Sequence, residues 1–335
     1  SALQKKHMYK LIKNFNEMNG KSAFCYSSKP IPSQHPLYFS DHSPSHWKDM
    51  EGSSCGDSRQ SPIDIQTSSV KSDPNLDSFI FQGFDSTQVI KSITNNGHTV
   101  TCELGDKLVN VSGGGLNGMY NVLQFHFHWG KADFINHPGS EHTVDGNRYP
   151  MEMHIVSMKD GLSSEQEDGY AVLGFFINVR SFRSWRTATI YVFHISNFVD
   201  QMVNVDQNIS INGLIGNVDL SKYYRYMGSL TTPQCSEAVV WTLFHEPIPV
   251  NSTLIQMFPL MTSFVDIYRP TQDLNGRQVY TSASSVPMFL GKTLNPTLPL
   301  VGGWRQCLAA EPPSVCECVC AWVNGTVTVK RFGPS

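Results

Sequence analysis

Two histidines alternate with aromatic residues in one short stretch of the chain. Residues 124–130 read QFHFHWG, and this period of two predicts a strand. Alternate side chains of a strand share a face at a repeat of about 7 Å, so His126 and His128 point the same way. Neutral imidazole nitrogen is a ligand that zinc accepts at about 2.0–2.1 Å. The pair indicates part of a metal site, although a His-x-His pair alone also fits ordinary histidines on a half-buried strand.

A candidate third ligand lies on a second predicted strand. Residues 151–156 read MEMHIV, and His154 follows His128 by 26 residues, enough for a loop and a return. Glu152 shares a face with His154, and Gln124 shares a face with His126, so each can orient the neighbouring imidazole. Both are also typical of solvated strand side chains, but the repeated spacing favours the first interpretation. Three histidines leave the fourth tetrahedral position of zinc open, as in catalytic rather than structural sites.

Further motifs accompany these histidines in a fixed order. They are RQSPIDI at 59–65, NNGH at 95–98, GSEHTVD at 139–145, GSLTTP at 228–233, YRP at 268–270 and NGRQ at 275–278. Together with the histidine strands they resemble the α-class carbonic anhydrases of the secreted or extracellular type, over about residues 36–284. The resemblance implies zinc-dependent, reversible hydration of carbon dioxide to bicarbonate and a proton by zinc-bound hydroxide.

The resemblance also implies a role for individual residues around the metal. The zinc ligands are His126, His128 and His154, with Gln124 and Glu152 as their hydrogen-bond partners. Two further residues, Thr231 and Glu141, are implied to orient the hydroxide. Thr232 and His98 are implied to contact the substrate and to carry the proton.

Thr231 is implied to accept the hydrogen bond of the hydroxide and to pass its own to a buried Glu141, while Thr232 helps to bind substrate or bicarbonate. Thr-Thr-Pro alone is an ordinary turn sequence.

His98 occupies the position of a proton shuttle, and an imidazole pKa near 6.5 suits that task. The alternative for His98 is a surface histidine beside a turn.

Carbon dioxide is small and apolar, so its site needs a wall of apolar side chains that excludes water. By register with the motifs, the residues that match this wall are Val156, Val172, Leu230, Val239 and Trp241. Each of them alone is more typical of a protein core than of a pocket.

Composition indicates a folded globule. The chain has 335 residues, of which 40% are hydrophobic and 16% charged, and its net charge is −3. Nothing in this balance suggests nucleic acid as a partner. No apolar run of 18 residues is present, so no transmembrane segment is visible. The chain starts at Ser1 without an apolar signal core, which we interpret as a processed or partial chain.

Short β-rich runs separated by turn signals position these motifs. They cover residues 89–94, 98–102, 107–111, 121–129, 151–158, 171–179 and 238–245, with a helix expected over 252–258. Residues 171–179 are almost continuously apolar and predict a central strand buried on both faces. The fold class implied is mainly β (α+β), a single domain around a large twisted, mostly antiparallel central sheet with short peripheral helices. Residues 180–217 depart from the family pattern, and their structure is left open.

We expect three parts in the chain: a weakly ordered arm over 1–35, a carbonic anhydrase domain over 36–284 and a Cys/Pro/Gly-rich extension over 285–335. The CxCxC pattern at 316–320 fits disulfides, disorder or a metal site, and extracellular signals favour the first two. The extension is a candidate attachment module for an extracellular partner.

Eight cysteines and four glycosylation sequons indicate an oxidising, extracellular setting. The sequons begin at Asn110, Asn208, Asn251 and Asn324. The resemblance implies a disulfide between Cys55 and Cys235, which flank the SPI and TTP motifs. The alternative function is a catalytically silent carbonic-anhydrase-like extracellular binding protein. Such relatives typically lack one or more zinc histidines, whereas this sequence has all three.

Overall fold

The computed structural model describes residues 43–161, 166–179, 209–262 and 264–282, together with the backbone of 202–204, 318–323 and 326–330. The chain divides into two compact units, Ser1–Val286 and Pro287–Ser335. The predicted arm over 1–35 lies outside the described residues.

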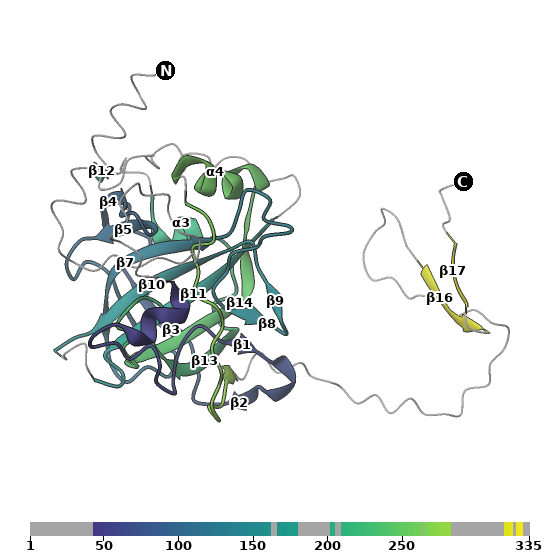
Figure 1. Cartoon of the computed structure of the whole chain (residues 1–335), viewed down its shortest axis with the longest axis horizontal. Coiled ribbons are helices and arrows are strands. Elements are labelled where there is room, and N and C mark those ends of the chain that lie inside the picture. The colour runs from purple at the N-terminus through teal and green to yellow at the C-terminus, as the bar shows by residue number, and fades with distance from the viewer. Residues whose placement is uncertain are drawn as a thin grey trace, which may run out of the picture. The chain divides into compact units, whose positions relative to one another are not determined.

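One mixed sheet of twelve strands forms the body of the first unit (Figure 1). Ten strands follow each other in the order β12-β4-β5-β7-β10-β11-β14-β13-β15-β2, and β6 joins β3 to β7 beside them. Their bounds are β2 Lys71–Asp73, β3 Phe79–Gln82, β4 Ile90–Asn95, β5 Val100–Leu104, β6 Asn110–Gly113, β7 Tyr120–Trp129, β10 Met151–Lys159, β11 Tyr170–Val179, β12 Met202–Asn204, β13 Tyr223–Gly228, β14 Val239–Val250 and β15 Tyr280–Ser282.

Most neighbouring strands of this sheet are antiparallel. The exceptions are β11 with β14 and β15 with β2, which pair in parallel. Outside the sheet, the described part of the first unit contains three short strands, β1 Asp64–Ile65, β8 Thr143–Val144 and β9 Asn147–Arg148, and four short helices, η1 Pro44–Asp49, η2 Thr67–Ser69, α3 Ile211–Ile215 and α4 Ser252–Thr262. This arrangement confirms the predicted fold class.

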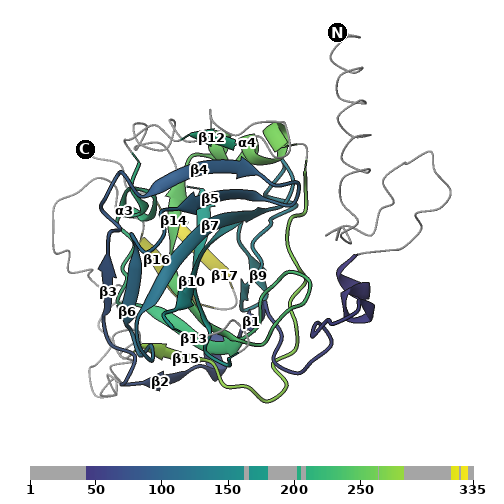
Figure 2. The same ribbon diagram turned by 90° about the vertical axis from the view of Figure 1, so that its left-hand side faces the viewer.

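The apolar run over 171–179 becomes β11, which lies between β10 and β14 as predicted for a central strand. Figure 2 shows β4, β5 and β7 side by side in the same sheet. Residues 171–177 of β11 are all buried, because both faces of the sheet are covered there. On one face, the large core includes Ile155, Phe175 and Phe244. On the other face, a smaller cluster surrounds Val172 and Trp241. The predicted site residues belong to this second face.

The region left open by the sequence contributes two described elements, β12 and α3. Helix α3 begins where the Ser210 side chain accepts a hydrogen bond from the Gly213 amide, and it ends at Gly216, whose φ is +67°. Helix α4 confirms the helix expected from residue 252 and extends it to Thr262, with Pro259 inside it.

In the second unit, strands β16 Cys318–Val323 and β17 Thr326–Lys330 form an antiparallel hairpin. The state of the cysteine side chains at 316–320 lies outside the described residues. Among the parts of the chain that the structure describes, no helix has the length and apolarity needed to cross a membrane.

Candidate metal centre

Three histidines from two neighbouring strands meet on the smaller-cluster face of the sheet. Strands β7 and β10 are antiparallel, and their register sets His126 opposite His154. One ligand nitrogen from each of His126, His128 and His154 lies within 4.8 Å of the other two. The three ring centroids are 4.5–5.3 Å apart. The structure therefore brings together the three residues that the sequence proposes as ligands.

Each of these imidazoles has an acceptor behind it. His126 Nδ1 lies 3.0 Å from Gln124 Oε1, and His128 Nδ1 lies 2.9 Å from the Ile267 carbonyl oxygen. His154 Nε2 lies 2.6 Å from Glu152 Oε1. Because all three partners accept, these nitrogens carry the protons.

The ligand atoms are then the opposite ring nitrogens, Nε2 of His126 and His128 and Nδ1 of His154. Burial lowers the pKa of His126 and His128 well below the usual value, so both rings are neutral at physiological pH. Neutral imidazoles of fixed tautomer are the donors that zinc prefers in open sites. The donor set fits a zinc ion.

A second group of potential ligands, His142, Glu152 and His154, is explained by hydrogen bonds instead. Glu152 Oε1 accepts from His154 and also from His142 Nδ1 at 2.7 Å, and Oε2 accepts from the His142 amide at 2.9 Å. Burial raises the pKa of Glu152, but attraction to His142 and His154 and their hydrogen bonds bring it well below its usual value. This carboxylate is therefore the anion that orients both imidazoles.

The hydrogen bonds continue from Glu152 through residues that the sequence analysis missed. Because His142 donates through Nδ1, its Nε2 accepts from the Tyr226 hydroxyl at 2.7 Å. Tyr226 in turn lies 2.8 Å from Ser61 Oγ, which accepts from the Ser229 amide at 3.0 Å. All four added residues are buried. Their only sequence signal was their place inside or beside the matched motifs, since distant partners cannot be read from spacing.

Glu141 lies beneath the histidines and is fully buried. Its Oε1 accepts from the Arg269 amide at 2.8 Å and lies 3.5 Å from His128 Nδ1. Burial raises the pKa of Glu141, while the interactions of its carboxylate with His154, the Arg269 amide and the Thr231 side chain oppose that rise. The structure thus places Thr231 and Glu141 next to each other, as the resemblance implies.

The five proposed wall residues, Val156, Val172, Leu230, Val239 and Trp241, belong to a single apolar cluster. In the sheet, Val156 pairs with Val172, and Val172 pairs with Trp241, so three of them form a row across β10, β11 and β14. The Trp241 ring lies 4.8 Å from the His154 ring. An apolar surface therefore begins directly beside the histidines.

His98 and Thr232 lie in turns near this centre, and both are half-buried. The turn of His98 joins β4 to β5, and Asn96 Oδ1 accepts from the His98 amide at 3.0 Å. Residue Thr101 of β5 pairs with His126, so the turn leads into the strand beside the proposed ligands.

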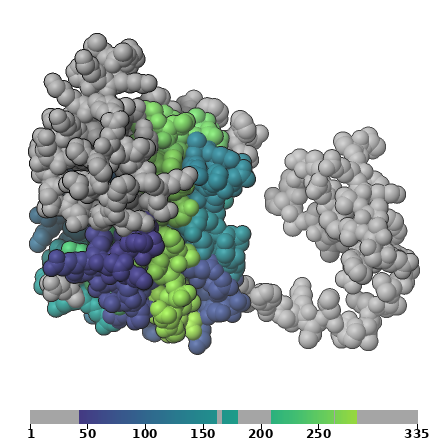
Figure 3. Space-filling model, in the orientation of Figure 1, coloured from purple at the N-terminus to yellow at the C-terminus, as the bar shows by residue number. Residues whose placement is uncertain are grey.

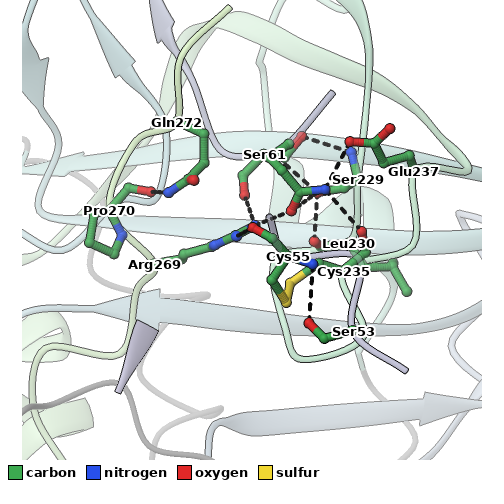
Figure 4. Close-up of a disulfide and its surroundings, with 11 residues drawn as sticks. Ser53, Cys55, Ser61, Ser229, Leu230, Cys235, Glu237, Arg269, Pro270 and Gln272 are labelled. Atoms are coloured by element: carbon green, nitrogen blue, oxygen red, sulfur yellow. Dashed lines mark hydrogen bonds between the residues drawn. A yellow bond between two sulfur atoms is a disulfide. The ribbon is translucent and has the colours of Figure 1, made fainter. Parts of the chain in front are cut away.

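The disulfide between Cys55 and Cys235 is present and packs against Trp47 (Figure 4). The Cys235 amide donates to the Thr232 carbonyl oxygen at 2.9 Å. The bridge therefore fixes the chain immediately after the Thr231–Thr232 turn.

Comparison with known proteins agrees with this geometry. Residues 42–283 match the family model of the eukaryotic-type carbonic anhydrase. Carbonic anhydrase 4 of Oryctolagus cuniculus is 35% identical over 287 residues, which cover 77% of this chain and 86% of that protein. Carbonic anhydrase 15 of Mus musculus is 33% identical, over 81% of this chain and 87% of that protein. Carbonic anhydrase 6 of Bos taurus is 33% identical, over 72% of this chain and 78% of that protein.

The fold and the group of three histidines able to hold a metal agree with these matches. The chain belongs to the carbonic anhydrase family, whose reaction is the hydration of carbon dioxide, and it is a carbonate dehydratase.

Proposed function

We propose that this enzyme hydrates carbon dioxide reversibly with a zinc ion held by His126, His128 and His154. The observation that carries the proposal is the convergence of three imidazoles whose outer nitrogens all face acceptors, at 3.0, 2.9 and 2.6 Å. Zinc in such a site supplies a Lewis acid that makes water acidic enough to react near neutral pH, with a pKa of about 7. The role of the protein is to hold these donors neutral and in one orientation.

Thr231 and Glu141 orient the reacting water. Glu141 is buried and takes one hydrogen bond from the Arg269 amide, so its position is fixed before substrate arrives. The Thr231 hydroxyl donates to Glu141, which leaves Thr231 Oγ1 able only to accept from the water. Because the water must then donate its hydrogen bond to Thr231 Oγ1, its lone pair is directed toward the carbon of carbon dioxide.

The apolar row of Val156, Val172 and Trp241 holds carbon dioxide beside the histidines, with Leu230 and Val239 extending it. Such a wall excludes competing water and makes no hydrogen bond that would hold the product. Thr232, at the next position after Thr231, binds bicarbonate as it forms. His98 carries the released proton from the site to solvent, because the ordinary pKa of imidazole lies near neutral pH and this side chain is partly exposed to solvent.

Alanine substitution of one proposed ligand tests this function. His128→Ala removes a buried ligand, whereas His137→Ala removes an exposed histidine outside the centre. We expect His128→Ala to lose both zinc and hydration activity and His137→Ala to keep both. Full activity in His128→Ala would refute the ligand assignment.

We propose an extracellular location and an N-glycan at Asn251. A buried disulfide is typical of oxidising compartments. Asn251 is half-buried at the start of α4, where its Oδ1 accepts from the Thr253 amide at 2.8 Å, and its Nδ2 is the atom that a glycan would modify. Glycosidase treatment should shift the mobility of the secreted parent protein more than that of Asn251→Gln.

We also propose that residues 36–284 form the catalytic domain and that 285–335 serve attachment to an extracellular partner. The division of the chain after Val286 supports this reading. Deleting 285–335 should then preserve hydration activity and change only localisation.

A further inference from the structure

Arg269 is a buried cation at the edge of the centre, with only 2% of its surface exposed. Its Nη1 donates to Gln60 Oε1 and to the Ser61 carbonyl oxygen, both at 2.8 Å, and its Nη2 donates to the Cys55 carbonyl oxygen at 3.0 Å. The guanidinium carbon lies 5.6 Å from the centre of the Trp47 ring. These three acceptors are neutral oxygens of one segment, so the planar fork of arginine fixes the path of residues 55–61.

That segment holds the turn of Thr231 at both ends. At one end, the Ser61 amide donates to Ser229 Oγ at 2.9 Å, and the Ser229 amide donates to Ser61 Oγ at 3.0 Å. At the other end, Cys55 is bonded to Cys235. Figure 4 shows these contacts around Arg269, and Figure 3 shows residues near 50 and near 270 side by side on the surface. A shift of the segment would therefore shift Thr231.

The backbone of Arg269 reaches the other partner of Thr231. Its amide donates to Glu141 Oε1 at 2.8 Å. Arg269 therefore makes two kinds of contact. Its main-chain amide binds the Glu141 carboxylate, and its side chain binds residues 55–61, which support the Thr231 turn.

We propose that Arg269 is a positioning residue for carbon dioxide hydration, which aligns the Thr231 hydroxyl with the Glu141 carboxylate. The inference rests on the proposed roles of Thr231 and Glu141. Arg269 acts through geometry, because its side chain donates to oxygens of Cys55, Gln60 and Ser61, which support the threonine turn from outside the centre.

Arg269→Lys tests this role, since lysine keeps the charge but cannot reach three acceptors as a planar fork. Arg225→Lys is a matched control. Arg225 is also buried and donates to neutral oxygens, the Gly114 carbonyl at 2.7 Å and Thr242 Oγ1 at 3.0 Å, and it lies 5.6 Å from the Tyr223 ring. These contacts support the fold away from residues 55–61 and from the Thr231 turn.

Zinc content, kcat/KM for hydration and thermal stability are measured for the parent and both variants. We expect both variants to keep zinc and to lose stability. The kcat/KM per bound zinc should fall about tenfold in Arg269→Lys and stay within about twofold of the parent in Arg225→Lys, because only the first change misaligns the Thr231 turn. Equal activity per zinc in the two variants would overturn the inference.

A double-mutant cycle separates positioning from general damage. In the Thr231→Ala background, Arg269→Lys should lower kcat/KM no further, because its target has been removed. A tenfold loss that persists in that background would also overturn the inference.

If Arg269→Lys does not fold, Gln60→Met removes one of the three acceptors and leaves the guanidinium in place. About a threefold loss per zinc is then expected, again absent in the Thr231→Ala background, and no loss overturns the inference. An inactive zinc-loaded parent protein would instead refute the proposed function itself, so the two failures are distinguishable.

Discussion

The same strands form both faces of the central sheet, but hydrogen-bonded polar side chains dominate one face at the metal centre and apolar packing dominates the other. On β10, Glu152 and His154 face the metal centre, where the Glu152 carboxylate accepts hydrogen bonds from His142 and His154. Met153 and Ile155 face the large apolar core, where contacts are made by shape alone. Strand alternation thus lets one segment carry chemistry on one side and stability on the other. Substitutions one residue apart should therefore fail in different ways.

The sharpest test of this difference is the pair His154→Ala and Ile155→Ala. We expect His154→Ala to lose zinc and reduce hydration to background, because a ligand is gone. Ile155→Ala should cost about 2–5 kcal/mol of unfolding free energy through the cavity it leaves, while its folded fraction keeps zinc and activity. Zinc analysis, hydration assays and denaturant unfolding would contradict the comparison if both variants lost activity per folded molecule equally.

Thr231→Ala tests the site face without removing a ligand. The variant should keep zinc but hydrate carbon dioxide on the order of 100-fold more slowly, because the reacting water is no longer oriented. Raising the buffer concentration should not restore the rate. A variant with full activity, or one repaired by buffer, would contradict the role of Thr231.

His98→Ala should have a smaller and conditional effect. Zinc and the carbon dioxide step should be unchanged, while overall turnover falls about tenfold or more in dilute or bulky buffer, because proton export is slowed. Small imidazole buffers should restore part of the rate. If hydration matches the parent protein at every buffer concentration, another group carries the proton.

The smallest effect is expected at Ser157, a buried polar residue on the strand face that meets the large apolar core. Ser157 is fully buried beside a register shift between β10 and β7, and its Oγ has no hydrogen-bond partner among the described residues. Ser157→Ala should leave stability unchanged or raise it by up to about 1 kcal/mol, because an unsatisfied hydroxyl is removed. The matched change Ser61→Ala, on the hydrogen-bonded face, should instead destabilise by about 1–3 kcal/mol. Equal destabilisation by both would contradict the distinction.

The sequence predicted the parts of this fold that repeat locally. Period-two patterns gave the strands of His126, His128 and His154, and the apolar run over 171–179 gave the central strand, because burial and side-chain alternation are local signals. The resemblance gave the pairing of Cys55 with Cys235, which the structure contains.

What the sequence could not predict depends on contacts between distant segments. Ser61 and Tyr226 are 165 residues apart and meet only after β13 enters the sheet. Arg269 belongs to the matched YRP motif, but its guanidinium contacts depend on the path of residues 55–61. Residues 180–217 gave no clear pattern, and strand β12 within them is assigned by pairing with β4.

The most direct test of the central claim is a zinc titration of the purified protein from which metal has been removed by chelation. Hydration of carbon dioxide is measured after each addition. We expect negligible activity without zinc and a linear rise that ends at one zinc per chain. Full activity in the zinc-free protein, or no activity at one bound zinc, would contradict the proposed zinc site.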